Sequence, residues 1–228
     1  MTSPHDQIVN GLFKLLVKHG QGDYIGESIS QLDHSLQAAD LATIANAADT
    51  TVAAALLHDC GQIIPPVVIN RQLKIHPEKD SEDQNVEYML LPSGQSVGRH
   101  GHDTIGAAYL SSPGFPLITC QLVHDHVIAK RYLTAVEKGY YDALSEASKA
   151  SLKFQGGPFT PDEIISFEKD PLFSEKVAMR RFDDAAKMVG KKVPGLEAYR
   201  TVLIRVLSVD LEKEGGGDAE GGKQGEMH

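Results

Sequence analysis

Residues 53–59 read Ala-Ala-Ala-Leu-Leu-His-Asp, an apolar run that ends in an adjacent histidine and aspartate. Alanine and leucine on most sides of the run predict a helix from Val52 to His58 at the centre of the core, capped by residues 49–51. A buried histidine and carboxylate are costly unless another group satisfies them. A metal ion would do so, because imidazole offers a neutral nitrogen and a carboxylate can bridge two ions. A capping or hydrogen-bonded pair is the commoner arrangement, so His58-Asp59 alone leaves both interpretations open.

Hydrophobic spacing predicts helices through most of the remaining chain. Residues 8–16 carry one apolar stripe, and Ser28 or Ser30 can cap a helix that runs through Leu41. We expect an all-α fold in one domain that covers residues 1–211. Further helices are expected at 103–111, 116–127, 133–138, 142–154, 161–168, 174–189 and 196–209.

The segment from Ile63 to Gly98 differs in composition, because it contains several prolines and a charge-rich stretch at 78–87. We interpret it as a long insertion between His58-Asp59 and the next histidine-bearing helix, and such long segments are often functional or disordered. Within it we expect a short helix at 85–90 and only weak strand-like alternation at 67–69. Residues 212–228 are mostly Gly, Glu, Asp and Lys, so they predict a disordered tail.

Bulk composition excludes several classes of protein. The 228 residues are 41% hydrophobic and 23% charged, which is typical of a globular chain. A formal charge of −9 argues against a general nucleic-acid-binding protein. No apolar run approaches the roughly 20 residues that a membrane span needs. Residues 1–7 lack the features of a signal peptide, and Cys60 and Cys120 form no disulfide framework, so we expect a cytoplasmic protein. The sequence does not indicate an oligomeric state.

Four other segments place a histidine or an aspartate in a helical, partly apolar context. His34 lies between leucines, His102 opens a helix in which Gly106 permits close packing, His126 ends a helix, and Asp183 lies mid-helix. Four histidines and two carboxylates suit two borderline metal ions, whereas one zinc ion needs fewer ligands. His100, His124 and Asp184 are neighbouring alternatives that could instead support a ligand or lie at the surface. The predicted ligands are His34, His58, Asp59, His102, His126 and Asp183.

Three stretches carry a resemblance to a known family. Residues 23–34 read Asp-Tyr-Ile-Gly-Glu-Ser-Ile-Ser-Gln-Leu-Asp-His, residues 126–133 read His-Val-Ile-Ala-Lys-Arg-Tyr-Leu, and residues 154–158 read Phe-Gln-Gly-Gly-Pro. With the order of the ligands, they resemble the HD-domain superfamily, a helical bundle. More narrowly, they resemble the mixed-valent diiron oxygenases that cleave the C–P bond of 1-hydroxyphosphonates. The resemblance covers residues 7–206 apart from the insertion.

The resemblance implies two iron ions, Fe(II) and Fe(III). His34, His58 and Asp183 would hold one iron, His102 and His126 the other, and Asp59 would bridge them. The resemblance also assigns roles around the substrate. Tyr24 would occupy the metal site when substrate is absent, and Glu27 would meet an amino or ammonium group of the substrate. The remaining implied substrate contacts are Lys130, Arg180, Ser148 and Ser151, which would receive the phosphonate.

The implied reaction consumes O2 and a small-molecule phosphonate, and it releases phosphate and a carboxylate. The expected substrate is a 1-hydroxy-2-(amino or trimethylammonio)alkylphosphonate. Two departures from the family pattern leave the identity of the substrate undecided. Gln62 stands near the substrate where relatives often carry histidine, and Ile63–Gly98 is inserted beside the expected pocket. The alternatives are an HD-type metal-dependent phosphohydrolase and a diiron oxygenase that acts on a different substrate. Tyr24 and Glu27 favour the oxygenase, because hydrolysis does not obviously require them.

Overall fold

The computed structural model describes residues 2–22, 24, 28–72 and 87–209, and this part of the chain is mostly helical. The predicted all-α fold is confirmed, with one small two-stranded sheet added to it. Of the predicted insertion, residues 73–86 lie outside the described residues, as does the predicted tail at 212–228. No described helix has the length and apolar character that crossing a membrane would require.

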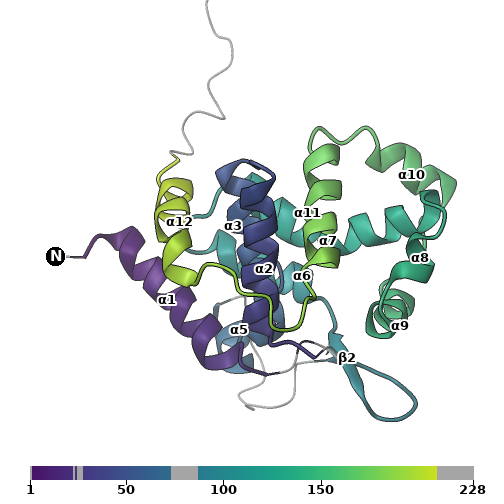
Figure 1. Ribbon diagram of the computed structural model, residues 1–228, viewed down its shortest axis with the longest axis horizontal. Coiled ribbons are helices and arrows are strands. Elements are labelled where there is room, and N and C mark those ends of the chain that lie inside the picture. The colour runs from purple at the N-terminus through teal and green to yellow at the C-terminus, as the bar shows by residue number, and fades with distance from the viewer. Residues whose placement is uncertain (1, 23, 25–27, 73–86, 210–228) are drawn as a thin grey trace, which may run out of the picture.

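Two central helices lie side by side in the middle of the molecule (Figure 1). These are α2 (Gln31–Ile44) and α3 (Asp49–Leu57), and α3 is buried over nearly its whole length. One side is covered by α1 (Pro4–His19) and α12 (Arg200–Leu207), and the other by α7 and α11 (Figure 1). The Ala-Leu helix therefore lies at the centre of the fold, as predicted, because a helix that is apolar all round must be covered on all sides.

The remaining elements extend this core toward a second, aromatic cluster around Tyr132 and Phe167. A short 3-10 helix, η1 (Leu196–Tyr199), precedes α12. The other helices are α4 (Cys60–Ile63), α5 (Pro66–Gln72), α6 (His102–Ser111), α7 (Leu117–Val136), α8 (Tyr140–Ala143), α9 (Glu146–Phe154), α10 (Pro161–Phe167) and α11 (Phe173–Ala185).

Helix boundaries differ from the sequence-based ones at several places. Predicted helices 116–127 and 133–138 are one continuous helix, α7, because no Gly or Pro interrupts residues 117–136. His126 therefore lies inside a helix and not at its end. The expected helix at 142–154 is divided into α8 and α9. The cap expected at residues 49–51 is wrong, because the helix already begins at Asp49 and Ala48 holds the cap position without a side-chain hydrogen bond.

The described part of the predicted insertion folds differently from expectation. Residues 67–69 are helical, within α5, so the strand-like signal there was misleading. We expected a helix at 85–90, and this prediction is wrong for the described part of that range. There the chain forms β1 (Tyr88–Leu90), a strand that pairs antiparallel with β2 (Ser96–Arg99). The pairing buries Met89 and Val97 on one face, which is the period-2 pattern of a half-buried strand too short to recognise by sequence alone.

Close packing of α4 on α6 depends on two glycines. A Cβ atom on Gly61 would lie 1.9 Å from the carbonyl oxygen of His102 and 2.9 Å from the backbone nitrogen of Gly106. Gly106 in turn lies against Cys60 and Gly61, where a Cβ would meet atoms at 3.3 Å. This contact brings the segment that carries His58-Asp59 against the start of the helix that carries His102.

Candidate metal centre

The structure brings the six predicted ligands together at the centre of the bundle, from five different places in the fold. His34 comes from α2 and His126 from α7, while His102 is the first residue of α6. His58 and Asp59 occupy the junction between α3 and α4, and Asp183 lies in the last turn of α11. All six side chains are buried, with residue exposures between 0% and 5%. The cluster is therefore shielded from bulk water.

The Asp59 carboxylate lies between two groups of ligands. Its Oδ2 atom is 3.8 Å from His34 Nε2 and 3.6 Å from His58 Nε2. Its Oδ1 atom is 3.3 Å from His102 Nε2 and 3.6 Å from His126 Nε2. The two oxygens of one side chain thus face different histidine pairs, and each group could hold one metal ion.

Asp183 joins the first of these groups. Its Oδ1 atom lies 3.3 Å from His34 Nε2 and 3.9 Å from His58 Nε2. Asp184, the alternative, points elsewhere, to Arg180 and Tyr140. His124 is hydrogen-bonded to Asp125 and partly exposed. His100 is exposed, so neither His100 nor His124 belongs to the cluster.

Backbone carbonyls favour one tautomer of the four ligand histidines. Each Nδ1–H can donate to a carbonyl oxygen, and in that neutral tautomer the Nε2 atom carries a lone pair that points into the cluster. The Nε2 atoms nevertheless lie only 3.0 Å apart in His34 and His58 and 3.2 Å apart in His102 and His126. Two such lone pairs repel each other unless a cation or proton lies between them, so the arrangement fits metal ions. The carbonyl partners of His34, His58, His102 and His126 are Ala186 at 2.9 Å, Ala55 at 2.9 Å, Arg99 at 3.1 Å and Val123 at 2.6 Å.

The charges in the cluster also suit cations. Burial alone would raise the pKa of Asp59, but His58 and His102 hold it well below its ordinary value. Arg180 likewise outweighs burial at Asp183 and keeps the pKa of that carboxyl low. Burial, followed by the neighbouring His102, lowers the pKa of His126 to about 3. Charged carboxylates and a neutral imidazole in a dry interior are the donor set that a cation requires.

Gln31 is a member of this centre that the sequence did not indicate as a site residue. Its side chain is buried, and its Nε2 donates to Asp59 Oδ2 at 3.1 Å. Gln31 precedes His34 by three residues on α2, which places both side chains on the same face of the helix. That spacing was the one available signal. Gln31 helps to fix the plane of the shared carboxylate.

A pocket opens beside the cluster. Its walls include the ligands Asp59, His102, His126 and Asp183. Met89 and Val97 of the hairpin add an apolar surface. Glu27, the remaining predicted contact, lies outside the described residues. The predicted substrate contacts that line the pocket are Tyr24, Gln62, Lys130, Ser148, Ser151 and Arg180.

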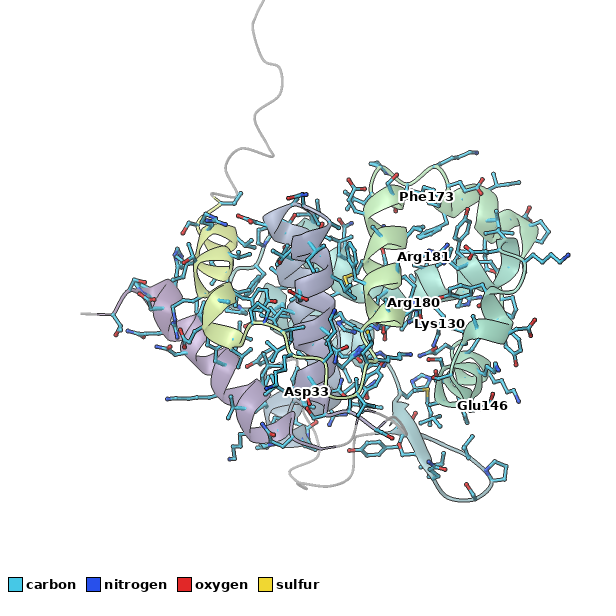
Figure 2. The ribbon with its side chains drawn as sticks, in the orientation of Figure 1. Asp33, Lys130, Glu146, Phe173, Arg180 and Arg181 are labelled. Atoms are coloured by element: carbon cyan, nitrogen blue, oxygen red, sulfur yellow. The ribbon has the colours of Figure 1, made fainter. Side chains whose placement is uncertain are left out.

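Lys130 and Arg180 give the pocket a cationic wall. They reach it from the neighbouring helices α7 and α11, and Figure 2 labels both. Lys130 Nζ donates to Ser151 Oγ at 3.1 Å, and Ser151 Oγ donates to the Ser148 carbonyl at 3.1 Å. Burial, together with the nearby Arg180 charge, lowers the pKa of Lys130 to about 7. Two buried cations beside hydroxyl groups form a site that an anion would stabilise.

Tyr24 lies directly against the cluster. Its ring stacks on His34 with the centroids 3.8 Å apart, and its hydroxyl lies 3.5 Å from Asp183 Oδ1. Burial and the Asp183 charge raise its pKa well above the ordinary value, so the side chain is a neutral phenol. Tyr24 thus lies at the border between the cluster and the pocket.

Gln62 and Gln155 both line the pocket, but their side-chain oxygens differ in whether they accept a hydrogen bond. Gln62 Oε1 accepts from the Arg99 backbone N–H at 2.7 Å, so its amide nitrogen is the atom left for other partners. Gln155 Oε1 is buried and has no hydrogen-bond partner among the described residues. The sequence did not indicate Gln155 as a site residue, because a missing hydrogen-bond partner cannot be read from sequence.

Comparison with known proteins identifies relatives that align with most of the chain. A hydroxymethylphosphonate dioxygenase of Gimesia maris is 39% identical over 193 residues, which cover 85% of each chain. A protein of Acanthamoeba polyphaga mimivirus is 34% identical over 202 residues, covering 89% of this chain and 83% of the relative. The 1-hydroxy-2-(trimethylamino)ethylphosphonate dioxygenase (glycine-betaine-forming) of Leisingera caerulea is 31% identical over 201 residues, covering 88% and 89%.

The family model of the HD domain matches residues 32–149, which include all the clustered ligands except Asp183. This match spans just over half of the chain, and the relatives align with most of it. The chain therefore belongs to the HD-domain family and is a homologue of phosphonate dioxygenases.

Proposed function

We propose that this protein is a mixed-valent diiron oxygenase that uses O2 to cleave the C–P bond of a 1-hydroxyphosphonate. The observation that carries the proposal is the Asp59 carboxylate, whose two oxygens face separate pairs of histidine Nε2 atoms at the wall of a cationic pocket. One iron would be held by His34, His58 and Asp183 and the other by His102 and His126, with Asp59 shared. When bound, the two irons supply the redox chemistry for O2 and a Lewis-acidic centre for the substrate oxygens.

The proposed reaction balances with one O2 per substrate. A 1-hydroxyphosphonate, R–CH(OH)–PO3H2, and O2 give a carboxylic acid, R–COOH, and phosphoric acid. The C–P bond and the C1–H bond break, C1 and phosphorus are oxidised, and O2 is reduced by four electrons. The products contain two more oxygen atoms than the substrate, so both atoms of O2 are accounted for.

The protein's own groups bind and orient the substrate. Lys130 and Ser151 would receive phosphonate oxygens through charge-assisted and neutral hydrogen bonds, and Ser148 and the free N–H groups of Arg180 lie on the same wall. Met89 and Val97 would exclude water from the reacting carbon. We propose that Tyr24 occupies the metal site when substrate is absent.

The test is the requirement for oxygen. Purified protein should contain iron, give a mixed-valent diiron EPR signal that changes on adding substrate, and release phosphate from a 1-hydroxyphosphonate only when O2 is present. Lys130→Met should raise KM for the phosphonate with iron content unchanged. Lys149→Met is the matched control, because Lys149 pairs with Glu146 instead of lining the pocket. Phosphate release from a phosphomonoester without O2 would instead support the HD-type phosphohydrolase.

A more specific proposal concerns the group at C2 of the substrate. We propose a 2-amino or 2-trimethylammonio substituent, with Glu27 as its partner. Turnover of hydroxymethylphosphonate, 1-hydroxy-2-aminoethylphosphonate and the trimethylammonio compound should be compared. Glu27→Ala should raise KM for the two cationic substrates only and leave the iron content unchanged. A clear preference for hydroxymethylphosphonate would contradict this assignment while leaving the proposed oxygenase chemistry intact.

A further inference from the structure

Behind Asp183, three side chains form a closed ring of hydrogen bonds. Arg180 Nε donates to the Tyr140 hydroxyl at 3.1 Å, and the Tyr140 hydroxyl donates to Asp184 Oδ2 at 2.5 Å. Arg180 Nη2 closes the ring with a hydrogen bond to Asp184 Oδ1. Tyr140 and Arg180 are buried, and Asp184 is largely covered.

The ring fixes the orientation of Arg180. A guanidinium group is planar, so three N–H donors bound to three different acceptors leave it no freedom to rotate. The third acceptor is Asp183 Oδ2, which receives Nη1–H at 2.6 Å. With Oδ2 occupied, Asp183 turns Oδ1 toward His34 at 3.3 Å and His58 at 3.9 Å. The hydrogen bonds that Tyr140 and Asp184 make with Arg180 thus decide which Asp183 oxygen faces the cluster.

Tyr140 owes its position to the local chain geometry. It is the first residue of α8 and follows Gly139, whose φ of 83° a residue with a side chain rarely adopts. Tyr140 belongs to the second, aromatic cluster, and Arg181 lies over its ring at 5.6 Å. The hydroxyl therefore reaches Arg180 from an element that carries no ligand, and it links the second core to the metal centre.

We propose that Tyr140 and Asp184 are positioning residues for the metal centre and the phosphonate site. They hold Arg180 so that Asp183 presents a single oxygen to the ion bound by His34 and His58, and so that the remaining Arg180 N–H groups face the pocket. This role rests on the proposed function: the part that concerns Asp183 rests on the metal centre alone, and the part that concerns the Arg180 donors rests also on the phosphonate substrate.

The test compares Tyr140→Phe with Tyr132→Phe. Both changes remove one hydroxyl from a buried tyrosine of the aromatic cluster, but the Tyr132 hydroxyl donates to Glu168 at 2.9 Å, away from the ligands. Loss of a group that orients a metal ligand typically weakens metal binding about 10–100-fold. Tyr140→Phe should release one of its two iron ions to a chelator roughly 10-fold faster or more, whereas Tyr132→Phe should match the wild type.

Two further measurements separate positioning from general stability. The metal-free forms of both variants should unfold at similar temperatures, because each loses one tyrosine hydroxyl. KM for the phosphonate should rise only in Tyr140→Phe, as the free Arg180 donors lose their orientation. Wild-type release of both ions and a wild-type KM in Tyr140→Phe would overturn the proposal.

Asp184→Asn tests the same positioning role if Tyr140→Phe does not fold. The amide keeps the shape of Asp184 but replaces one of its two acceptor oxygens with an NH2 group, so one of the hydrogen bonds from Arg180 and Tyr140 is lost and the release of one ion should also be faster. Unchanged release in Asp184→Asn would overturn the proposal. Wild-type protein that binds no metal would overturn the metal centre itself, which distinguishes that failure from a substrate other than a phosphonate.

Discussion

Several side chains at this site take part in more than one interaction, and the protonation state of a titratable side chain decides whether it can bind an anion. Lys130 is an example, because it is buried beside Arg180 and its pKa is lowered to about 7. A lysine carries its charge only below its pKa, so the cationic wall is complete below pH 7 and weakens above it. An anionic substrate should then bind more strongly on the acidic side of this transition.

This predicts a pH dependence for substrate capture. The value of kcat/KM for a 1-hydroxyphosphonate should fall as the pH rises through about 7, because free Lys130 loses its proton there. Lys130→Arg should move this decline to higher pH, since a guanidinium stays charged. A decline that persists unchanged in Lys130→Arg would belong to another group, such as the substrate itself.

Gln155 offers a second prediction at the scale of one side chain. A buried carbonyl oxygen without a partner costs about 1–3 kcal/mol, and Gln155 Oε1 is such an atom at the pocket wall. Gln155→Leu should leave the melting temperature unchanged or raise it, and should raise KM if the substrate supplies the missing donor. Steady-state kinetics and calorimetry measure the two effects. A lower melting temperature with an unchanged KM would mark the residue as purely structural.

At the scale of elements, the contact between α4 and α6 determines how the two halves of the ligand set meet. Gly61→Ala would place a methyl group 1.9 Å from the His102 carbonyl oxygen, and the neighbour is backbone that cannot turn away. Overpacking of this kind costs about 1–3 kcal/mol, or more where the backbone must move. We therefore expect a lower melting temperature and a lower iron content.

Gly11→Ala is the control for this prediction. Gly11 lies in the middle of α1, and a Cβ added there would meet nothing within 4 Å. Replacing a helical glycine by alanine in open space should stabilise by about 0.5–1 kcal/mol. Thermal unfolding of the two variants should move in opposite directions. Equal shifts would show that the approach of α4 to α6 is not tight.

At the scale of the whole molecule, the centre adds a cross-link between helices that already share one hydrophobic core. Metal ions bound only by the folded state stabilise it by about 2.7 kcal/mol at 100 times Kd and 4.1 kcal/mol at 1,000 times Kd. For a domain of this size, 1 kcal/mol shifts the melting temperature by about 2–4 °C. Removal of one ion should thus lower the melting temperature by roughly 5–15 °C.

Calorimetry with and without a chelator measures this loss. His58→Ala should melt near the temperature of the chelated wild type and respond little to the chelator. His124→Ala should behave like the wild type, because His124 lies outside the cluster and is partly exposed. A chelator that leaves wild-type melting unchanged would contradict a role for metal in holding the bundle together.

The sequence predicted the helical fold and the set of clustered side chains, because both depend on local patterns. The Ala-Leu run before His58 and the apolar contexts of His34 and His126 are readable within a few residues. The hairpin was missed because three residues at 88–90 are too few for a period-2 signal. The roles of Gln31 and Tyr140 depend on partners 28 and 40 residues away in the chain, which no local pattern contains.

The hairpin is joined to the centre at one fixed point. The Arg99 guanidinium donates to the carbonyl oxygens of Gly61 and Ile64 at 2.6 and 2.7 Å, and the Arg99 carbonyl accepts from His102. Met89 and Val97, by contrast, supply only the apolar surface of the pocket. Changes at Met89 or Val97 would therefore alter the pocket wall, and with it the substrates that fit, while leaving the ligands in place. A change at Arg99 would instead loosen the hairpin from α4 and disturb the carbonyl that orients His102, so different residues of one short hairpin govern substrate range and metal binding.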